Sequence, residues 1–257
     1  MIVAGVDIGS LTAKAVILQG NDILGYSIIP AGPDVIRVAE NTLTTALDKA
    51  GLKRDQLAVV VSTGYGRANV PLASKSVTEI TCDAKGAHCL FPETRMVIDI
   101  GGQDSKVISL DQEGRVIDFT MNDKCAAGTG RFLEVMAQAL EIELKELGPV
   151  SLKHKKSLVI SSMCTVFAES EVISLIAEGY PKEDILNGLH QAIASRVSAM
   201  AQSLRVENVV TLGGVAKNIG VVKAIERTLR VKVKVPPEPQ IIAALGAAIC
   251  AQEMTAQ

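Results

Sequence analysis

GVDIGSLTAK at residues 5–14 is repeated as VIDIGGQDSK at residues 97–106. Three residues of the first copy recur 92 positions later in the second copy (for example, 99 − 7 = 92). Asp7 corresponds to Asp99, Gly9 to Gly101, and Lys14 to Lys106. Each copy has β-forming runs on both sides of its turn, at residues 2–6 and 15–18 or 96–98 and 107–110. Two such runs around a turn predict a hairpin. The chain is therefore expected to contain the same hairpin twice.

The tips of these hairpins have the composition of a phosphate site. Glycines let backbone N–H groups approach an anion, and Ser10 and Thr12 add hydroxyl donors to the first tip. Asp7 and Asp99 stand at strand ends, and a hydrated Mg²⁺ needs only one or two carboxylates. Two ordinary packing hairpins are the alternative. A single DIG tripeptide would be weak support, but a doubled one with lysine at the same offset favours phosphate.

Composition narrows the class of protein. The 257 residues are enough for two modest lobes, and a net charge of −2 does not resemble a nucleic-acid-binding protein. No apolar run reaches the roughly 18 residues of a membrane span, and MIVAGVDIGS lacks the features of a signal peptide. Five irregularly spaced cysteines do not form a disulfide framework. We expect no membrane or nucleic-acid partner and a reduced, cytoplasmic setting.

The rest of the chain alternates between β-type and helical patterns. Residues 57–61 precede STGYG, and residues 209–212 precede Gly213, Gly214 and the helical pattern VAKNIGVVKAIERTL. The segment PQIIAALGAAICAQE (239–253) also predicts a helix, in which Ala244, Gly246 and Ala247 permit tight packing. A turn at KHKK (153–156) is expected before a strand at residues 158–160. The predicted class is α/β.

Two phosphate hairpins, a double-glycine segment and two small-residue helices resemble the actin, sugar-kinase and heat-shock-chaperone ATPase fold. The resemblance implies a first connecting helix at VTEITCDAKGAHCLF (77–91) and a second at PQIIAALGAAICA (239–251). It also implies ATP and Mg²⁺ in a cleft between two lobes. We expect a first lobe at residues 1–93, a second at residues 94–237, and a helix at residues 238–257 that joins the first. By this resemblance Glu79 falls near the residue that orients the attacking water, with Gln103 and Asp104 as rival candidates.

Two cysteines stand apart from what such an ATPase requires. Cys125 precedes an apolar stripe of Phe132, Met136 and Leu140. Cys164 follows two possible helix caps, Ser161 and Ser162, and precedes apolar positions at Val166, Ile173 and Ile176 and a stop at Gly179. A helix N-terminus carries roughly half a positive charge and favours a metal-binding thiolate. The alternative is two small buried residues, which is the interpretation given to Cys82, Cys89 and Cys250.

The number of thiols bears on assembly. Two thiolates cannot complete a tetrahedral zinc site or a four-iron cluster. Two chains related by a two-fold axis supply four, and such dimers are the commonest oligomers. If Cys125 and Cys164 bind a cluster, we expect it to be shared across a dimer interface.

KCAAGTGRFLE (124–134) and SSMCTVFAESEVISLIAEG (161–179), downstream of the two hairpin motifs, resemble the activator ATPases of 2-hydroxyacyl-CoA dehydratases. Relatives of that family include the ATPase subunits of benzoyl-CoA reductase. The resemblance implies a homodimer with one [4Fe–4S] cluster, held by Cys125 and Cys164 of each protomer. It also implies ATP or ADP contacts from the two tips and the double-glycine segment: Asp7, Gly9, Ser10, Leu11, Thr12, Ala13, Lys14, Asp99, Gly101, Gly102, Gln103, Asp104, Gly213, Gly214, Lys217 and Gln240.

The activity implied by this resemblance is ATP-driven transfer of a low-potential single electron. The acceptor would be a 2-hydroxyacyl-CoA dehydratase or a related cluster-containing reductase, and the donor ferredoxin or flavodoxin. A small-molecule kinase and a non-redox, actin-like nucleotide switch are the alternatives. The kinase alternative leaves Cys125 and Cys164 unexplained.

Overall fold

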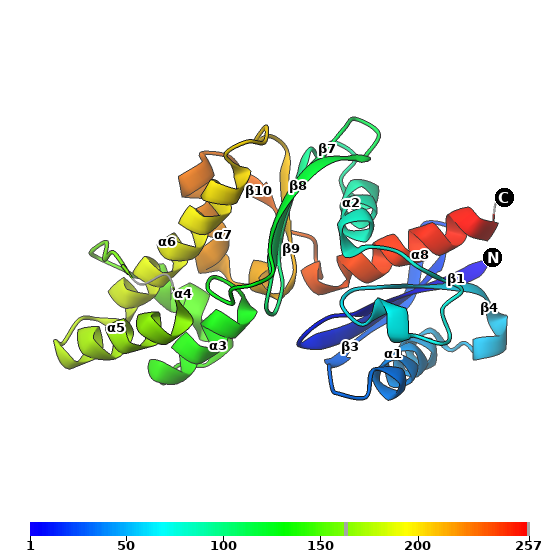
Figure 1. Ribbon diagram of the computed structural model, residues 1–257, viewed down its shortest axis with the longest axis horizontal. Coiled ribbons are helices and arrows are strands. Elements are labelled where there is room, and N and C mark those ends of the chain that lie inside the picture. The colour runs from blue at the N-terminus through cyan, green and yellow to red at the C-terminus, as the bar shows by residue number, and fades with distance from the viewer. Residues whose placement is uncertain (162–163, 256–257) are drawn as a thin grey trace. The chain divides into compact units, whose positions relative to one another are not determined.

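The computed structural model describes residues 1–161 and 164–255, and the chain divides into two compact units (Figure 1). Unit 1 contains Met1–Thr94, Leu110–Ile117 and Pro236–Gln257, and unit 2 contains Arg95–Ser109 and Asp118–Val235. The segment Leu110–Ile117, inside the stretch expected for the second lobe, belongs to unit 1 because its turn packs on a helix of that unit: a Cβ on Gly114 would lie 2.4 Å from the His88 ring.

Unit 1 is built on a five-stranded sheet with the order β3-β2-β1-β4-β5. β1 pairs antiparallel with β2 and parallel with β4. β1 is buried along almost its whole length because helices cover both of its faces, which is why its sequence is a nearly continuous apolar run. The bounds are β1 Ile2–Ile8, β2 Thr12–Gln19, β3 Asp22–Pro30, β4 Leu57–Thr63 and β5 Lys75–Ser76.

The α-helices of unit 1 among the described residues are α1 Val35–Ala50, α2 Glu79–Leu90 and α8 Ile242–Thr255; α1 and α8 pack on the sheet, and α2 packs on α8. Asp34 caps α1 by accepting a hydrogen bond from the Arg37 N–H, and Gly51 ends it in the left-handed conformation. α8 packs on α2, β1 and β4 through its small residues, as the sequence predicts, and Ala244, Ala247 and Ala248 are fully buried. No helix among residues 1–161 and 164–255 is long and apolar enough to cross a membrane.

Unit 2 repeats the sheet of unit 1, with the order β10-β9-β6-β7-β8. β6 pairs antiparallel with β7 and parallel with β9, as β1 does with β2 and β4. The repeat predicted from two short motifs therefore extends to whole sheets. The bounds are β6 Met96–Ile100, β7 Ser105–Leu110, β8 Val116–Asn122, β9 Val209–Leu212 and β10 Val233–Lys234.

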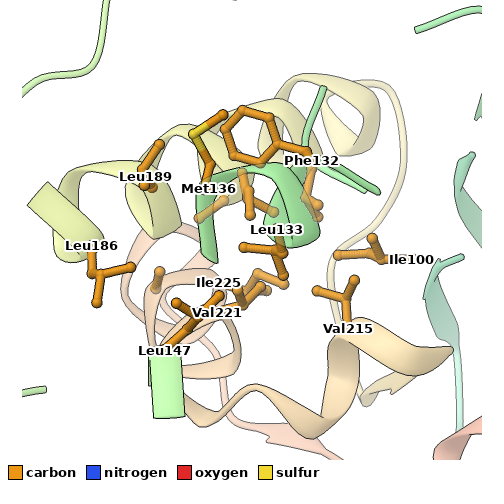
Figure 2. Close-up of a cluster of buried hydrophobic side chains, with 14 of the residues drawn as sticks. Ile100, Phe132, Leu133, Met136, Leu147, Leu186, Leu189, Val215, Val221 and Ile225 are labelled. Carbon is orange, nitrogen blue, oxygen red and sulfur yellow. The ribbon is translucent and has the colours of Figure 1, made fainter. Parts of the chain in front are cut away.

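The helices of unit 2 enclose a large apolar core (Figure 2). They are α3 Gly130–Ala139, α4 Leu147–Ser151, α5 Thr165–Ala177, α6 Lys182–Ala201 and α7 Ile219–Leu229. The predicted stripe of Phe132, Met136 and Leu140 is confirmed, because all three side chains are buried in this core. Short 3-10 helices complete the fold at Arg54–Gln56, Arg67–Asn69, Leu144–Glu146, Gly214–Lys217 and Pro239–Ile241.

One predicted element of unit 2 is wrong. Residues 158–160 follow the expected turn but form no strand. The carboxylate of Asp184 accepts hydrogen bonds from the backbone N–H groups of Lys155 and Lys156, and these bonds lower the pKa of Asp184. Leu158 and Ile160 then pack against Gly188 of α6. Ile160 is therefore buried against a helix without a neighbouring strand, whereas Val159, between Leu158 and Ile160, is 86% exposed.

Candidate functional site

The first hairpin holds its acidic residue in a fixed position. Asp7 and Lys14 face each other in the register of β1 and β2, and Lys14 Nζ lies 2.9 Å from Asp7 Oδ2. The tip closes when the Gly9 N–H donates to the Thr12 carbonyl oxygen at 3.1 Å. Ser10 and the other tip residues are half-buried, so their polar groups remain partly accessible. Unit 1 therefore presents a carboxylate, an ammonium group and a small-residue turn together.

The second hairpin has the same construction. Asp99 and Lys106 are register partners, and Lys106 Nζ lies 3.0 Å from Asp99 Oδ2. The Gly101 N–H donates to the Asp104 carbonyl oxygen at 2.9 Å, which closes this tip as the Gly9 bond closes the first. Asp104 is buried and also ion-paired to Lys106, whereas Gln103 is exposed at the tip.

Each aspartate rests against a glycine that follows the neighbouring parallel strand. Gly64 follows β4 with φ +85°, and a Cβ there would lie 2.3 Å from Asp7 Oδ1. Gly213 follows β9 with φ +80°, and a Cβ there would lie 2.5 Å from Asp99 Oδ1. Positive φ and this close approach both require glycine. Sequence reasoning assigned no role to Gly64, although the glycine after a β-type run in STGYG was the available signal.

The two singled-out cysteines lie in unit 2. Cys164 is the N-cap residue of α5 and is exposed, and its carbonyl oxygen accepts a hydrogen bond from the Ala168 N–H. Cys125 is half-buried and lies five residues before the start of α3 at Gly130 (130 − 125), in the loop after β8. All five cysteines are free thiols. The alternative of two buried packing residues is therefore wrong for Cys164.

The predicted helix caps, the predicted helix stop and the predicted burial of the other cysteines can each be compared with the structure. Ser161 does not cap α5, because its N–H and hydroxyl both donate to the Glu171 carboxylate. Ser162, the other predicted cap, lies outside the described residues. The predicted stop is confirmed at Gly179, which has φ +82°. Of the remaining cysteines, Cys82 and Cys250 are buried as predicted; Cys89 is exposed in the last turn of α2, so its prediction as a packing residue is wrong.

A cation that sequence reasoning missed lies beside Cys125. Arg196 Nη2 on α6 is 3.9 Å from Cys125 Sγ. The same side chain passes Gly128, where a Cβ would lie 3.2 Å from Arg196 Cδ. No pattern in the sequence pairs two residues 71 positions apart (196 − 125), so only the packing of α6 against this loop reveals the contact.

The cysteine loop is also connected to the second hairpin tip. The Gly130 N–H donates to the Gly101 carbonyl oxygen, and the Arg131 N–H donates to the Gly102 carbonyl oxygen, both at 2.9 Å. The first N–H groups of a helix have no partner inside the helix. Here the tip of the β6–β7 hairpin supplies two of those partners, so a displacement of the tip acts directly on the start of α3.

The model of the BadF/BadG/BcrA/BcrD ATPase family matches residues 4–251. The chain belongs to this family. The 2-hydroxyisocaproyl-CoA dehydratase activator of Clostridioides difficile is 47% identical over 253 residues, which cover 98% of this chain and 95% of that one. The (R)-2-hydroxyglutaryl-CoA dehydratase activating ATPase of Acidaminococcus fermentans is 44% identical over 256 residues, covering 98% of each chain.

Some solved structures are similar to this ATPase in both sequence and fold, and others in fold alone. The Clostridium difficile activator with bound ADPNP matches with a TM-score of 0.95 and 46% identity, covering 100% of this chain and 96% of that one. A glucokinase of the ROK family from Streptomyces griseus, at 15% identity and a TM-score of 0.63 with 98% and 100% coverage, shares the fold alone. The predicted actin-like α/β fold is confirmed.

The remaining predicted nucleotide residues of this ATPase divide between the units. The 3-10 helix after β9 in unit 2 begins at Gly214 and ends at Lys217, and Gly213 is its N-cap residue. Lys217 is exposed. Gln240 lies in the 3-10 helix before α8 in unit 1, half-buried. Glu79, the first residue of α2, also belongs to unit 1, whereas its rivals Gln103 and Asp104 belong to unit 2.

Proposed function

We propose that this chain is an activator ATPase that delivers low-potential single electrons to a 2-hydroxyacyl-CoA dehydratase or a related cluster-containing reductase. The proposal is supported by relatives 44–47% identical over nearly the full chain, which are themselves dehydratase activators. The observation that carries it is the connection in unit 2 between a hairpin of phosphate-site composition and the loop of Cys125. An ordinary kinase has no need for that connection.

ATP or ADP, with Mg²⁺, is the proposed ligand of the two hairpins. Asp7 and Asp99 supply the carboxylates that a hydrated Mg²⁺ prefers. Lys14 and Lys106 hold these carboxylates in place and contribute positive charge toward phosphate. The proposal is supported by the relative crystallised with ADPNP. Which of Glu79, Gln103 and Asp104 orients the attacking water is part of the proposal; of the two in unit 2, the exposed Gln103 is the better candidate, because Asp104 is committed to an ion pair.

The donor chemistry of unit 2 suits a [4Fe–4S] cluster. Such clusters take four cysteine thiolates, and two protomers of this chain would contribute Cys125 and Cys164 each. Cys164 stands at a helix N-terminus, where negative charge is favoured, and Cys125 contacts a guanidinium group. A cluster held by these residues would take up and release one electron at low potential. A reducing cytoplasmic setting is part of the proposal and is supported by the five free thiols.

We propose that a second copy of this chain packs against the exposed face of α5. This face carries large apolar side chains that are exposed to solvent: Val166 is 66% exposed, Phe167 67% and Ile173 54%. Side chains of this kind are normally buried. They follow Cys164 directly along the helix, so apolar surface is continuous with a proposed ligand. Exposed apolar patches of this kind mark interaction sites. A two-fold dimer through α5 would cover the patch and bring the thiols of both protomers together.

Anaerobic purification tests the whole proposal. We expect a brown dimer with about four irons, since a [4Fe–4S] cluster contains four. The protein should hydrolyse ATP and, in the presence of ATP and reduced ferredoxin or flavodoxin, reduce an isolated dehydratase such as that of Acidaminococcus fermentans. A colourless protein that contains no iron and phosphorylates a small molecule would contradict the proposal and favour a kinase.

Arg196 is expected to raise the reduction potential of the bound cluster, because reduction adds a negative charge near its guanidinium group. Replacing Arg196 with methionine should lower the potential by roughly 60 mV, since 1.4 kcal/mol corresponds to about that shift for one electron. Arg196→Lys keeps the charge and should shift it less. The measurement is a redox titration of the purified protein followed by EPR. An unchanged or higher potential in Arg196→Met would contradict this role.

A further inference from the structure

Cys82 and Cys250 form a thiol pair at the contact between α2 and α8, two helices of unit 1. The helices meet almost backbone to backbone, because a Cβ on Gly246 would lie 1.8 Å from the Cys82 carbonyl oxygen. A Cβ on Gly86, one turn further along α2, would lie 2.3 Å from the Ile242 carbonyl oxygen. This crossing brings Cys250, one turn after Gly246, to the Cys82 side chain.

The two sulfur atoms are electrostatically unequal. The Cys82 thiol is hydrogen-bonded to Cys250, and this bond together with burial raises the pKa of Cys82. The same bond lowers the pKa of Cys250; burial and the Glu253 carboxylate oppose this shift, and the ammonium group of Lys85, which is ion-paired with Glu253, favours it. Cys250 is therefore the more acidic thiol of the pair, and Cys82 is the hydrogen-bond donor to it. A thiolate beside a second thiol is the arrangement that thiol oxidation requires.

A cavity lies beside the pair, although neither cysteine lines it. Unit 1 contains a cavity of about 560 Å³ lined by α2, α8 and the turn at Glu113–Val116. Thr81 and Ile249, the chain neighbours of Cys82 and Cys250, line this cavity, as does Lys85. Cys250 itself is 8% exposed, whereas Cys82 is fully buried. Cys250, the more acidic of the two thiols, is therefore also the more exposed residue of the pair.

We propose that Cys82 and Cys250 are a redox modification site, at which hydrogen peroxide converts the two thiols to a disulfide that joins α2 to α8. The Cys250 thiolate attacks one peroxide oxygen, the O–O bond breaks, and hydroxide leaves, so that Cys250 becomes a sulfenic acid. The Cys82 sulfur then attacks the Cys250 sulfur and the S–O bond breaks. The second oxygen leaves as water with the proton of Cys82, and two electrons have passed from sulfur to peroxide.

Peptide mapping of the intact, anaerobically purified protein tests this site. The protein is treated with hydrogen peroxide, alkylated and digested with trypsin. Cleavage after lysine and arginine leaves the five cysteines in five separate peptides, with Cys82 in residues 76–85 and Cys250 in residues 235–257. We expect these two peptides to be joined, with the loss of two hydrogen atoms, and to separate on treatment with a thiol reductant. The readout requires neither iron nor ATP, so it is independent of the proposed activator function.

Matched variants separate this reaction from general oxidation. In Cys82→Ser the joined peptide should disappear while Cys250 is oxidised to sulfenic or sulfinic acid. In Cys89→Ser, which removes the exposed thiol at the other end of α2, the joined peptide should persist. The proposal is overturned if Cys82 and Cys250 remain alkylated after peroxide has oxidised the other cysteines, or if Cys250 reaches sulfinic acid in the wild-type protein with no joined peptide.

Discussion

Cys164→Ser is expected to abolish ATP-dependent reduction of the partner dehydratase and to remove most of the iron from the purified protein. In the proposed dimer the substitution replaces two of the four cluster ligands, because each protomer contributes one Cys164. A serine hydroxyl is not a thiolate and does not replace it. The loss of electron delivery should exceed about 100-fold, since even removing an outer partner of a metal ligand costs 10–100-fold. Iron analysis and the visible spectrum are measured beside the acceptor assay.

The same variant should leave the fold and the proposed nucleotide-binding residues intact. Cys164 is exposed and its side chain makes no capping hydrogen bond, so the unfolding free energy should change by no more than about 0.5 kcal/mol. ATP binding should persist. Cys89→Ser, at another exposed thiol, is the matched control and should keep iron and activity. A Cys164→Ser protein that still carries four irons per dimer and delivers electrons would refute the ligand assignment.

Gly246→Ala should destabilise unit 1 strongly, although alanine favours a helix by about 1 kcal/mol over glycine. The added Cβ would lie 1.8 Å from the Cys82 carbonyl oxygen and 2.5 Å from the Cys82 carbonyl carbon, and backbone atoms cannot rotate away. α8 must move off α2, which opens the packing of both helices. We expect a loss of about 3 kcal/mol or more, at the upper end of overpacking effects. Urea unfolding followed by circular dichroism measures it.

Gly32→Ala is the matched control for this prediction. A Cβ there would meet only Val38 Cγ2, at 3.5 Å, which is an ordinary contact. Its stability should stay within about 0.5 kcal/mol of the wild-type protein. Equal unfolding midpoints for Gly246→Ala and the wild-type protein would show that α2 and α8 do not meet as closely as described.

Sequence reasoning succeeded where the determinants are local. The hairpins, the α3 stripe and the stop at Gly179 depend on residues within one or two turns of each other, so short patterns were enough. It failed at residues 158–160, where Leu158 and Ile160 pack on a helix and Val159 is exposed, because a strand would show the same alternation. It also failed at Cys89, because the face of α2 that packs against α8 depends on a helix more than 150 residues away (242 − 89).

The sequence by itself determined the duplicated hairpins and the position of Cys164 at a helix start. These follow from residues that are close together in the chain, whereas the ion pairs of Asp7 with Lys14 and of Asp99 with Lys106 were seen only in the strand register of the structure. Only the tertiary structure decided which glycines support the aspartates, that Arg196 faces Cys125, that the second tip is bonded to α3, and that Cys82 meets Cys250. Each of these contacts joins separate elements, and their proximity arises from the packing of sheets and helices, which no local pattern encodes.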